Sequence, residues 1–390
     1  MQLTVENLGQ IKKANIRLGD LTVLVGPQAT GKSIFLQLLN LVADNGFIRS
    51  EMKRVGIEWG KDPKRFFDVF FGEGMRQLWD DDKTSVTVDG KVIDLRKNPR
   101  NSNESQETFF YIPAQRVLAL RNGWPRPFSE FSPVDPFLVR HFSERLRLLM
   151  ENEFSSEKAT LFPQFNRLKK EFRDLLDKAI FGSLSLQSDD AQNQKRLVLK
   201  KAGSKESLPF MVWSAGQREF IPLLMGLYWL LPPGKIPRRD PIDWVVIEEP
   251  EMGLHPKAIS STLVLVMDLL KRGYRVCIST HSTDVLDVIW AIQTIRQHQD
   301  QLAKSDQEKF FLRIFGLPLN QVLRDLASEV LGKSMSVYYF DRDGTTKDIS
   351  SLDPGANEPS VSGWGGLTDY AGRIADVVAD VITNASRKER

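Results

Sequence analysis

One segment of eight residues near the N-terminus constrains the fold more than any other part of the chain. It follows an apolar run at residues 21–25 and precedes a stretch whose apolar side chains recur at helical spacing. Its two glycines permit backbone dihedrals that other residues avoid, so that N–H groups at a helix start can surround a phosphate. The sequence therefore predicts a phosphate-binding loop between a buried strand and a helix. The predicted nucleotide-binding residues are Gly26, Pro27, Gln28, Ala29, Thr30, Gly31, Lys32 and Ser33.

The last two residues of this loop have separate predicted roles. We expect the Lys32 ammonium to contact the β- and γ-phosphates of a nucleoside triphosphate, and the Ser33 hydroxyl to ligate Mg²⁺. The alternative is a glycine-rich turn without a ligand.

Composition narrows the setting in which such a loop would work. The 390 residues are 41% hydrophobic and 26% charged, which is enough for one large domain with a subdomain. A net charge of +3 neither requires nor excludes nucleic acid. The single cysteine, Cys277, lies in an apolar run, so we expect no disulfide and no cysteine metal cluster. The N-terminus lacks a signal-like pattern and no apolar stretch is long enough for a bilayer. These features predict a cytoplasmic protein without a membrane span.

The order of apolar and polar segments divides the chain into four parts. Residues 1–130 and 201–300 alternate strand-like and helix-like patterns, and an Asp-Gly pair at 89–90 predicts a hairpin within an insertion at about 47–108. A polar run at 96–107 is expected to be a surface loop. Residues 131–200 are expected to form a helical lobe, since residues 137–181 have helical periodicity in two segments separated near Pro163. A further hairpin is predicted at 195–210 with its turn near 202–204, and residues 301–390 predict helices, a hairpin and a tail. No heptad run is long enough for an extended coiled coil.

Two acidic residues follow a second apolar strand pattern at residues 244–247. We expect Glu248 to hold the waters around Mg²⁺ and Glu249 to orient or deprotonate an attacking water, as in a Walker B-type site. A solvated acidic turn is the alternative. A third apolar run, residues 275–280, ends at His281, whose imidazole could contact a γ-phosphate, although a lone histidine is more often structural.

Residues 214–217 read Ser-Ala-Gly-Gln and precede a long helical pattern. The spacing of Ser214 and Gln217 matches a capping box, which would make this segment a plain helix start. A helix start with a hydroxyl and a bare glycine is equally suited to a terminal phosphate. Both interpretations remain open from the residues alone.

In this order, the loop, the Ser-x-Gly-Gln segment, the paired acids and the histidine resemble the parts of an ABC-type ATPase head. The phrase at residues 248–256, Glu-Glu-Pro-Glu-Met-Gly-Leu-His-Pro, is similar to the group that includes RecF, the chromosome-maintenance ATPases and the overcoming-lysogenization-defect proteins. The resemblance covers residues 1–46, 108–121 and 205–290. It implies an α/β fold: a P-loop head with a mixed sheet and flanking helices, an inserted helical lobe and no long coiled coil.

This resemblance also implies cofactors and partners. ATP and Mg²⁺ would be bound, with Glu249 and His281 catalytic and with Ser33, Glu248 and Gln115 at the metal. Ser214, Gly216 and Gln217 would act on the nucleotide held by Lys32 of a second copy, which implies a homodimer or a higher even-numbered homo-oligomer. Residues 251–255 would cross the seam between the copies. The signature departs from the commoner Leu-Ser-Gly-Gly-Gln, and Glu248 stands where many heads carry Asp.

Family resemblance points to an ATPase that controls a separate effector, such as a nuclease, in bacterial anti-phage defence. A RecF-like DNA-binding clamp is the alternative, and a scaffold that binds ATP without hydrolysing it is a third possibility. Six arginines near two aromatic residues could form a groove for nucleic acid or an acidic partner, or simply a solvated helical face. They are Arg116, Arg121, Arg126, Arg140, Arg145 and Arg147, with Trp124 and Phe128.

Two features of the C-terminal region have competing interpretations. Asp341 and Asp343 resemble the paired aspartates of a Toprim nuclease, but the flanking residues favour a hairpin around an Asp-Gly turn. Trp364 lies in a turn-rich stretch and would suggest a docking tail if its ring were exposed.

Overall fold

The computed structural model describes residues 1–57, 64–95, 106–156, 158–191, 194–204, 206–234 and 236–388. Most of the predicted surface loop at 96–107 therefore lies outside the described residues. A six-stranded sheet forms the centre of the molecule, in the order β16-β15-β3-β14-β13-β6. Five of its strands are parallel and β16 runs antiparallel to β15. The strands are β3 (Leu21–Val25), β6 (Phe109–Ile112), β13 (Trp244–Glu248), β14 (Arg275–Thr280), β15 (Met335–Phe340) and β16 (Thr346–Asp348).

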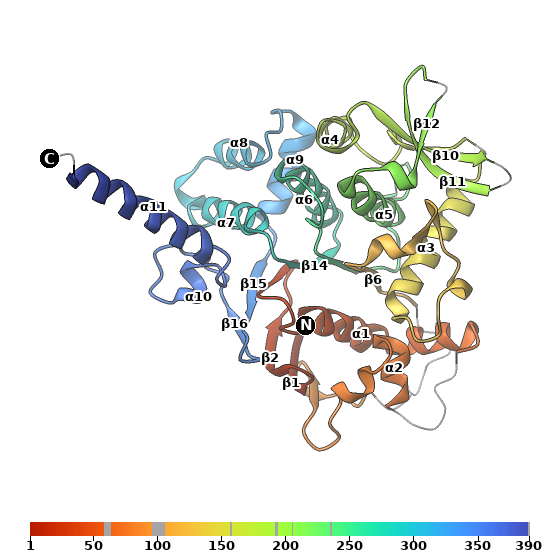
Figure 1. Cartoon of the computed structure of the whole chain (residues 1–390), viewed down its shortest axis with the longest axis horizontal. Coiled ribbons are helices and arrows are strands. Elements are labelled where there is room, and N and C mark those ends of the chain that lie inside the picture. The colour runs from red at the N-terminus through yellow and green to blue at the C-terminus, as the bar shows by residue number, and fades with distance from the viewer. Residues whose placement is uncertain are drawn as a thin grey trace.

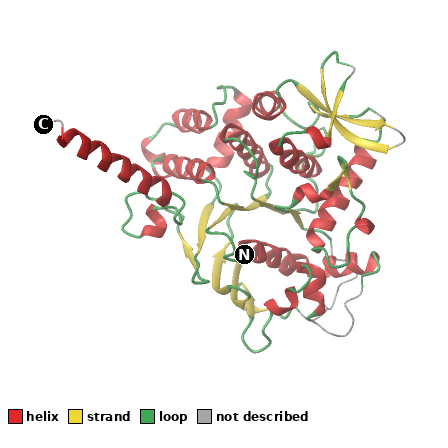
Figure 2. Ribbon diagram, in the orientation of Figure 1, coloured by secondary structure: helices red, strands yellow, loops and turns green. Residues whose placement is uncertain are grey.

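Both faces of this sheet are covered by other elements, which explains why its inner strands β3, β13 and β14, taken together, are mostly apolar. Val245 and Ile247 of β13 enter one core together with apolar residues of α5, α6 and α7. Val246 and Cys277 enter a second core with α1 and the N-terminal strands. Figures 1 and 2 show α5, α6 and α7 on one side of the sheet and α1 on the other. The helices are α1 (Lys32–Arg54), α5 (Ala215–Leu230), α6 (Pro256–Lys271), α7 (Thr283–Gln297), α8 (Lys304–Ile314) and α9 (Gln321–Leu331).

A separate antiparallel sheet lies at the N-terminal end, in the order β2-β1-β4-β5. The predicted hairpin at the Asp-Gly pair is confirmed: Val88 pairs with Lys91, and Asp89 and Gly90 both have positive φ. Helix α2 (Arg65–Phe71) follows α1 along the chain and buries four phenylalanines in the same core. The strands are β1 (Gln2–Leu8), β2 (Ile11–Arg17), β4 (Ser85–Val88) and β5 (Lys91–Val92).

The lobe predicted as helical at residues 131–200 contains helices α3 (Phe137–Glu153) and α4 (Lys170–Leu176), and also strands. Its four-stranded antiparallel sheet, β12-β11-β10-β9, packs through Leu186, Leu197 and Leu199. The hairpin with its turn at 202–204 is confirmed, whereas β9 and β10 were not expected. The strands are β9 (Thr160–Phe162), β10 (Leu184–Ala191), β11 (Gln194–Lys201) and β12 (Ser207–Pro209). A further short pair is β7 (Leu120–Arg121) and β8 (Trp124–Pro125).

The C-terminal region contributes β15 to the central sheet, next to β3. Asp341 and Asp343 lie in the turn between β15 and β16, where the Asp343 carboxylate accepts hydrogen bonds from Thr345, in agreement with the hairpin interpretation. Trp364 is buried and its indole lies 5.8 Å from that of Trp290, so the exposure on which a docking tail depended is not present. Beyond α10 (Pro359–Ser362), helix α11 (Asp369–Lys388) projects from the body of the molecule (Figure 1).

Among the helices in the described ranges, none combines the length and the apolar content needed to cross a bilayer.

Candidate nucleotide-binding site

The carboxyl ends of three neighbouring strands meet at one edge of the central sheet. Val25 of β3 pairs with Thr280 of β14, and Ser279 pairs with Glu248 of β13. Because these strands are parallel, the predicted loop after β3, the acids after β13 and His281 after β14 are brought to the same edge. Sequence positions more than 200 residues apart thus form one site.

Two glycines shape the loop at residues 26–33. Gly26 and Gly31 have φ values of 148° and 98°. A Cβ on Gly26 would lie 2.4 Å from the Phe340 carbonyl oxygen, and a Cβ on Gly31 would lie 2.6 Å from the Ile11 side chain. No other residue could therefore occupy these positions without displacing a neighbour. Ala29 also has a positive φ, 61°.

The remaining loop residues differ in their surroundings. The Thr30 hydroxyl donates a hydrogen bond to the Pro27 carbonyl oxygen at 2.9 Å, which closes the turn. Gln28, Ala29 and Ser33 are exposed at the mouth of the loop. The sequence-predicted binding residues thus form a single turn with its polar rim open to solvent.

The Lys32 side chain is only 6% exposed and lies inside this turn. Its Nζ donates hydrogen bonds to the carbonyl oxygens of Gly26 and Pro27, both at 2.7 Å. Burial lowers the pKa of the Lys32 ammonium to about 8, and three nearby carboxylates oppose that shift. The three are those of Glu249, Glu251 and Glu248.

The carboxylate of Glu248 fits a role at a magnesium ion. It is 1% exposed; one oxygen accepts a hydrogen bond from the Ala114 N–H at 3.0 Å, while Oε1 has no hydrogen-bond partner. Burial raises the pKa of Glu248, against the lowering effect of the Ser33 and Tyr111 hydroxyls. Mg²⁺ prefers oxygen ligands, and this site offers a buried carboxylate oxygen without a hydrogen-bond partner close to a serine hydroxyl.

No cluster of three or more His, Cys, Asp or Glu side chains suited to a metal occurs in the described part of the chain. A magnesium ion here would therefore depend on Ser33 and Glu248, with its other ligands from phosphates and water.

Glu249 and His281 face each other across the strand ends. Glu249 Oε1 lies 3.5 Å from His281 Nε2, and the Glu249 backbone has a positive φ of 43°. The imidazole is the main cause of a lowered pKa for the Glu249 carboxyl, which is thereby held ionised. An ionised carboxylate in this position can orient a water molecule and accept its proton.

Glu251 has a structural role that the sequence did not reveal. Its Oε1 accepts hydrogen bonds from the Thr280 hydroxyl and from the His281 N–H, both at 2.7 Å. Burial raises the pKa of this carboxyl. The Glu251 side chain, expected near a seam between copies, is thus engaged within its own chain.

Arg116 was also missed as a site residue. Its side chain is completely buried and donates hydrogen bonds to the carbonyl oxygens of Glu248, Glu249 and Glu219, at 3.0, 3.1 and 3.0 Å. It therefore fixes the backbone turn that carries both acids. Sequence order could not show this, because Arg116 follows β6 and the acids follow β13.

The predicted metal residue Gln115 lies next to this arginine and is exposed. It lines a cavity of about 520 Å³ together with Glu248, Tyr111 and Gln37. The structure thus brings Gln115 and Glu248 to one cavity, although no hydrogen bond joins them.

The Ser-Ala-Gly-Gln segment forms the start of α5 and a reciprocal capping box. The Ser214 hydroxyl accepts from the Gln217 N–H at 3.2 Å, and the Gln217 side chain accepts from the Ser214 N–H at 3.1 Å. Gly216 allows close approach to the turn after β13, since a Cβ there would lie 2.9 Å from the Gly253 carbonyl oxygen. Within the described residues, no hydrogen bond or ion pair joins this segment to the phosphate loop of the same chain.

The six arginines considered for a nucleic-acid groove do not form one. Arg116 and Arg140 are buried, which also contradicts the solvated-face interpretation for these two. Arg126 donates to backbone carbonyls of Leu118 and Glu130. The other three form ion pairs: Arg121 with Glu130, Arg145 with Glu107, and Arg147 with Glu144 and Glu151.

A phosphate loop after one parallel strand, with paired acids and a histidine after its neighbours, defines this protein as a P-loop ATPase head. Its sequence matches the family described as "AAA domain, putative AbiEii toxin, Type IV TA system" over residues 89–287, just over half of the chain. The chain belongs to this family. The matched region contains Gln115, Ser214, both acids and His281, whereas the phosphate loop precedes it.

No curated protein is detectably similar to the chain in sequence. Solved structures with some likeness include "Crystal structure of the SmcHead bound to the C-winged helix domain of ScpA", with 13% identity, 89% of this chain and 96% of that chain covered, and a TM-score of 0.41. The SMC head domain from Thermotoga maritima is 11% identical, with 73% of this chain and 90% of that chain covered and a TM-score of 0.27. A third structure is the Smc head domain with an extended coiled coil bound to the C-terminal domain of ScpA, derived from Pyrococcus furiosus. It is 12% identical, with 89% of this chain and 94% of that chain covered and a TM-score of 0.33. At these values the likeness adds nothing to what the strand order shows.

Proposed function

We propose that this P-loop ATPase hydrolyses ATP, forms a dimer around the nucleotide and thereby controls a separate effector. The observation that carries the proposal is a division of the predicted residues into two groups. Lys32, Glu248, Glu249 and His281 share one edge of the sheet. Ser214 lies at an exposed helix start, and no hydrogen bond or ion pair of the described residues joins it to the phosphate loop of its own chain. An exposed serine of this kind is accessible to a nucleotide that another copy presents.

Each residue of the first group has a specific task in this mechanism. The loop N–H groups and Lys32 bind the β- and γ-phosphates, and Ser33 and Glu248 hold the magnesium ion. That ion, when bound, neutralises the charge that develops on the transferred phosphoryl group. Glu249 orients the attacking water and accepts its proton.

Three further contacts keep this arrangement in place. Arg116 fixes the backbone of both acids, Glu251 fixes the chain at His281, and His281 holds the Glu249 carboxylate. Preorganised groups of this kind lower the activation barrier because they need not rearrange during the reaction.

The surroundings of Ser214 support pairing of two copies. Met211 and Val212, directly before the start of α5, are 70% and 62% exposed, and Leu208 is also exposed. Exposed apolar side chains grouped beside a predicted binding element are typical of an interface. Pairing through this face would bury them and place Ser214 over the nucleotide of the other copy.

Three variants test this proposal. We expect Lys32→Ala to abolish nucleotide binding, Glu249→Gln to retain ATP and accumulate as a dimer, and Ser214→Arg to bind ATP as a monomer without turnover. Nucleotide content and oligomer mass should be measured for all three. Equal loss of ATP binding in the first two variants would contradict the separate roles, and normal turnover of Ser214→Arg would refute the composite site.

Helix α11 supports the presence of an effector. Four large apolar side chains are exposed along this projecting helix, and their spacing of three or four residues places them on one side. Such an unpartnered stripe would bind the apolar surface of another protein. The description of the family names a toxin and a TA system, which is compatible with a two-component device. Anti-phage defence is the setting that we propose for it. The four residues are Ile374, Val377, Val378 and Val381.

Effector control predicts that the product of a neighbouring gene copurifies with the wild-type chain in fixed ratio. The same product should not copurify with the double variant Val377→Ser/Val381→Ser. That double variant should keep wild-type ATP turnover. Duplex DNA that accelerates turnover with a steep salt dependence would instead favour the RecF-like clamp, for which the buried and paired arginines give no support.

A further inference from the structure

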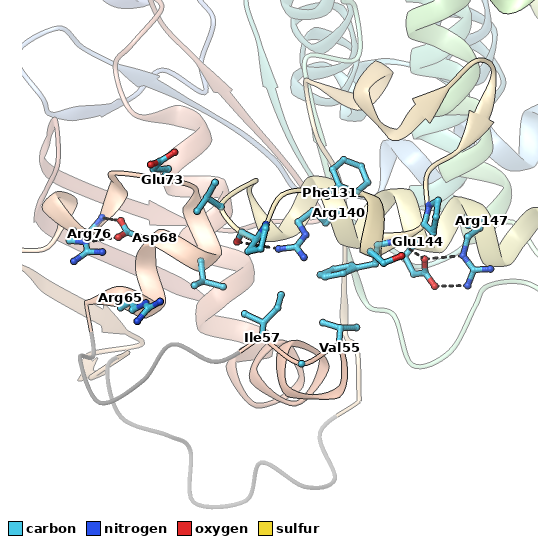
Figure 3. A pocket seen from close by; sticks show the side chains of 17 residues that line it. Val55, Ile57, Arg65, Asp68, Glu73, Arg76, Phe131, Arg140, Glu144 and Arg147 are labelled. Atoms are coloured by element: carbon cyan, nitrogen blue, oxygen red, sulfur yellow. Dashed lines mark hydrogen bonds and ion pairs between the residues drawn. The ribbon is translucent and has the colours of Figure 1, made fainter.

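A cavity of about 880 Å³ lies away from the phosphate loop, between the end of α1, helix α2 and helix α3. Figure 3 shows the side chains that surround it, with Arg140 near its middle and charged side chains at both sides. None of the predicted ATP-site residues lines this cavity. Its volume is in the range of sites that bind small molecules.

Arg140 is the unusual group in this cavity. Its side chain is only 4% exposed, its guanidinium lies 4.0 Å over the Phe128 ring, and it donates one hydrogen bond, to the Pro133 carbonyl oxygen at 3.3 Å. Its Nε has no partner, and no carboxylate of the described residues forms an ion pair with it. Burial lowers the pKa of Arg140, and the charge of the nearby Asp135 carboxylate opposes this shift without forming an ion pair. A guanidinium has five N–H donors, and a single hydrogen bond leaves the others of Arg140 available to a ligand in the cavity.

The other charged groups around the cavity do not compensate Arg140. Glu144 is bound to Arg147 and accepts a hydrogen bond from the Phe128 N–H. Asp68 is bound to Arg76 through both its oxygens. Arg65 and Glu73, at opposite rims, are exposed, and neither forms an ion pair with another of the described residues. Arg140 thus lacks an ion-pair partner among the described residues, while Asp68 and Glu144, the buried or half-buried acids of the cavity wall, are already bound to arginines.

Apolar side chains form much of the remaining wall, among them Val55, Ile57, Val69, Phe131 and Val134. We propose that this cavity binds a small phosphorylated molecule with an apolar or aromatic body, about the size of a mononucleotide, whose phosphate pairs with Arg140. Arginine donors match a phosphate geometrically, and such charge-assisted bonds are stronger than neutral ones. The ligand supplies the charge that the fold leaves unpaired.

Phe131 connects this cavity to the ATP site. It also lines the 520 Å³ cavity that contains Gln115 and Glu248, so the segment from Phe131 to Pro136 separates the two spaces. A ligand that packs against Phe131 can therefore change the shape of the cavity beside Glu248.

The test uses Lys32→Ala as the starting protein, so that the phosphate loop does not contribute and the result does not depend on ATP hydrolysis. Thermal unfolding and isothermal titration are measured with AMP and with inorganic phosphate, at matched ionic strength. We expect AMP to stabilise the protein and to bind more tightly than phosphate. Adding Arg140→Met should weaken AMP binding at least tenfold.

Arg140→Met has a second expected effect that a merely structural role would not produce. Methionine keeps an apolar stem over Phe128 but removes the unpaired charge, so the ligand-free protein should be as stable as before or more so. Arg121→Met, at an exposed ion pair outside the cavity, is the matched control and should leave AMP binding unchanged.

Two results would overturn the proposal: no binding of AMP or phosphate at about 10 mM, or an Arg140→Met protein that loses stability while AMP binding persists. Phosphate binding as tight as AMP binding would refute the apolar body of the ligand. Failure of the ATPase proposal would appear elsewhere, in the nucleotide content of Lys32→Ala and Glu249→Gln.

Discussion

The carboxylate of Glu251 accepts a hydrogen bond from the backbone N–H of His281 at 2.7 Å. This bond joins the turn after β13, which carries the paired acids, to the turn after β14, which carries the histidine. The second bond of Glu251, to the Thr280 hydroxyl, strengthens the same connection. Glu251 is therefore a positioning residue: it acts on the nucleotide site through His281.

We predict that Glu251→Ala lowers the kcat for ATP roughly 10- to 100-fold, because a displacement of about 1 Å at a reacting group has effects of this size. The dissociation constant for ATP should change little, since the phosphate loop is intact. Steady-state hydrolysis and equilibrium ATP binding measure the two quantities. Glu329→Ala, at an exposed position of α9, is the control. An unchanged kcat would show that His281 does not need this support.

Arg116→Met should destabilise the whole protein. The substitution removes the Arg116 donors from three backbone carbonyl oxygens, one buried and two part-buried, and we expect the free energy of unfolding to fall by about 2–4 kcal/mol. Denaturant titration measures the loss. Arg121→Met removes only an exposed ion pair and should change the free energy by less than about 0.5 kcal/mol. Similar values for both variants would contradict the buried role of Arg116.

ATP binding should depend on the protonation of Lys32. Its pKa in the free protein is lowered to about 8, and a bound triphosphate should raise it again because the ammonium gains an anionic partner. The affinity for ATP should therefore fall about tenfold for each pH unit above about 8, and binding should take up one proton there. Titration calorimetry in two buffers of different ionisation enthalpy detects this uptake. At about pH 6.5 the ammonium is already charged, so Lys32 should contribute no uptake.

Asp44 should make stability depend on pH. Its buried carboxylate accepts hydrogen bonds from the N–H groups of Thr108 and Phe109, yet burial raises its pKa to about 6. The folded-state pKa thus exceeds the usual 3.8, so protonation of Asp44 stabilises the folded protein. This stabilisation is fully present below about pH 4 and is lost as the pH rises through about 6.

The neutral variant Asp44→Asn can keep these bonds, because its carbonyl accepts from both N–H groups and its amide can donate to the Thr108 hydroxyl. We expect Asp44→Asn to be about 2–3 kcal/mol more stable than the wild type at pH 7.5 and equal to it near pH 4. Urea unfolding at the two pH values measures this. A variant less stable at pH 7.5 would mean that the hydrogen bonds to the ionised form outweigh its burial.

Local patterns predicted the parts of the site that depend on neighbouring residues in the chain. The glycines of the loop, the acids after an apolar strand and the Asp-Gly hairpin are all set by backbone conformation within a few residues. Each was found where the sequence placed it. The roles assigned to Glu249, His281, Ser214 and Gln115 remain predictions, because they require a nucleotide or a second copy.

Patterns over short distances failed where burial was decided by distant elements. Strand β10 has polar residues among its apolar ones, and only its partners β9 and β11 make it a strand. Trp364 lies among turn residues but packs on Trp290 of α7. Arg116 and Arg140, which look like ordinary surface cations in the sequence, are enclosed by segments from elsewhere in the chain.

The sequence by itself determined that a phosphate loop, paired acids and a histidine each follow an apolar strand, since a few consecutive residues suffice to encode a turn. Only the tertiary structure decided that β13 and β3 flank β14, which brings the three turns to one edge. It also decided that Arg116 fixes the backbone of the acids and that Arg140 is buried without an anion. Parallel pairing and burial depend on contacts between residues far apart in the chain, and no local pattern records them.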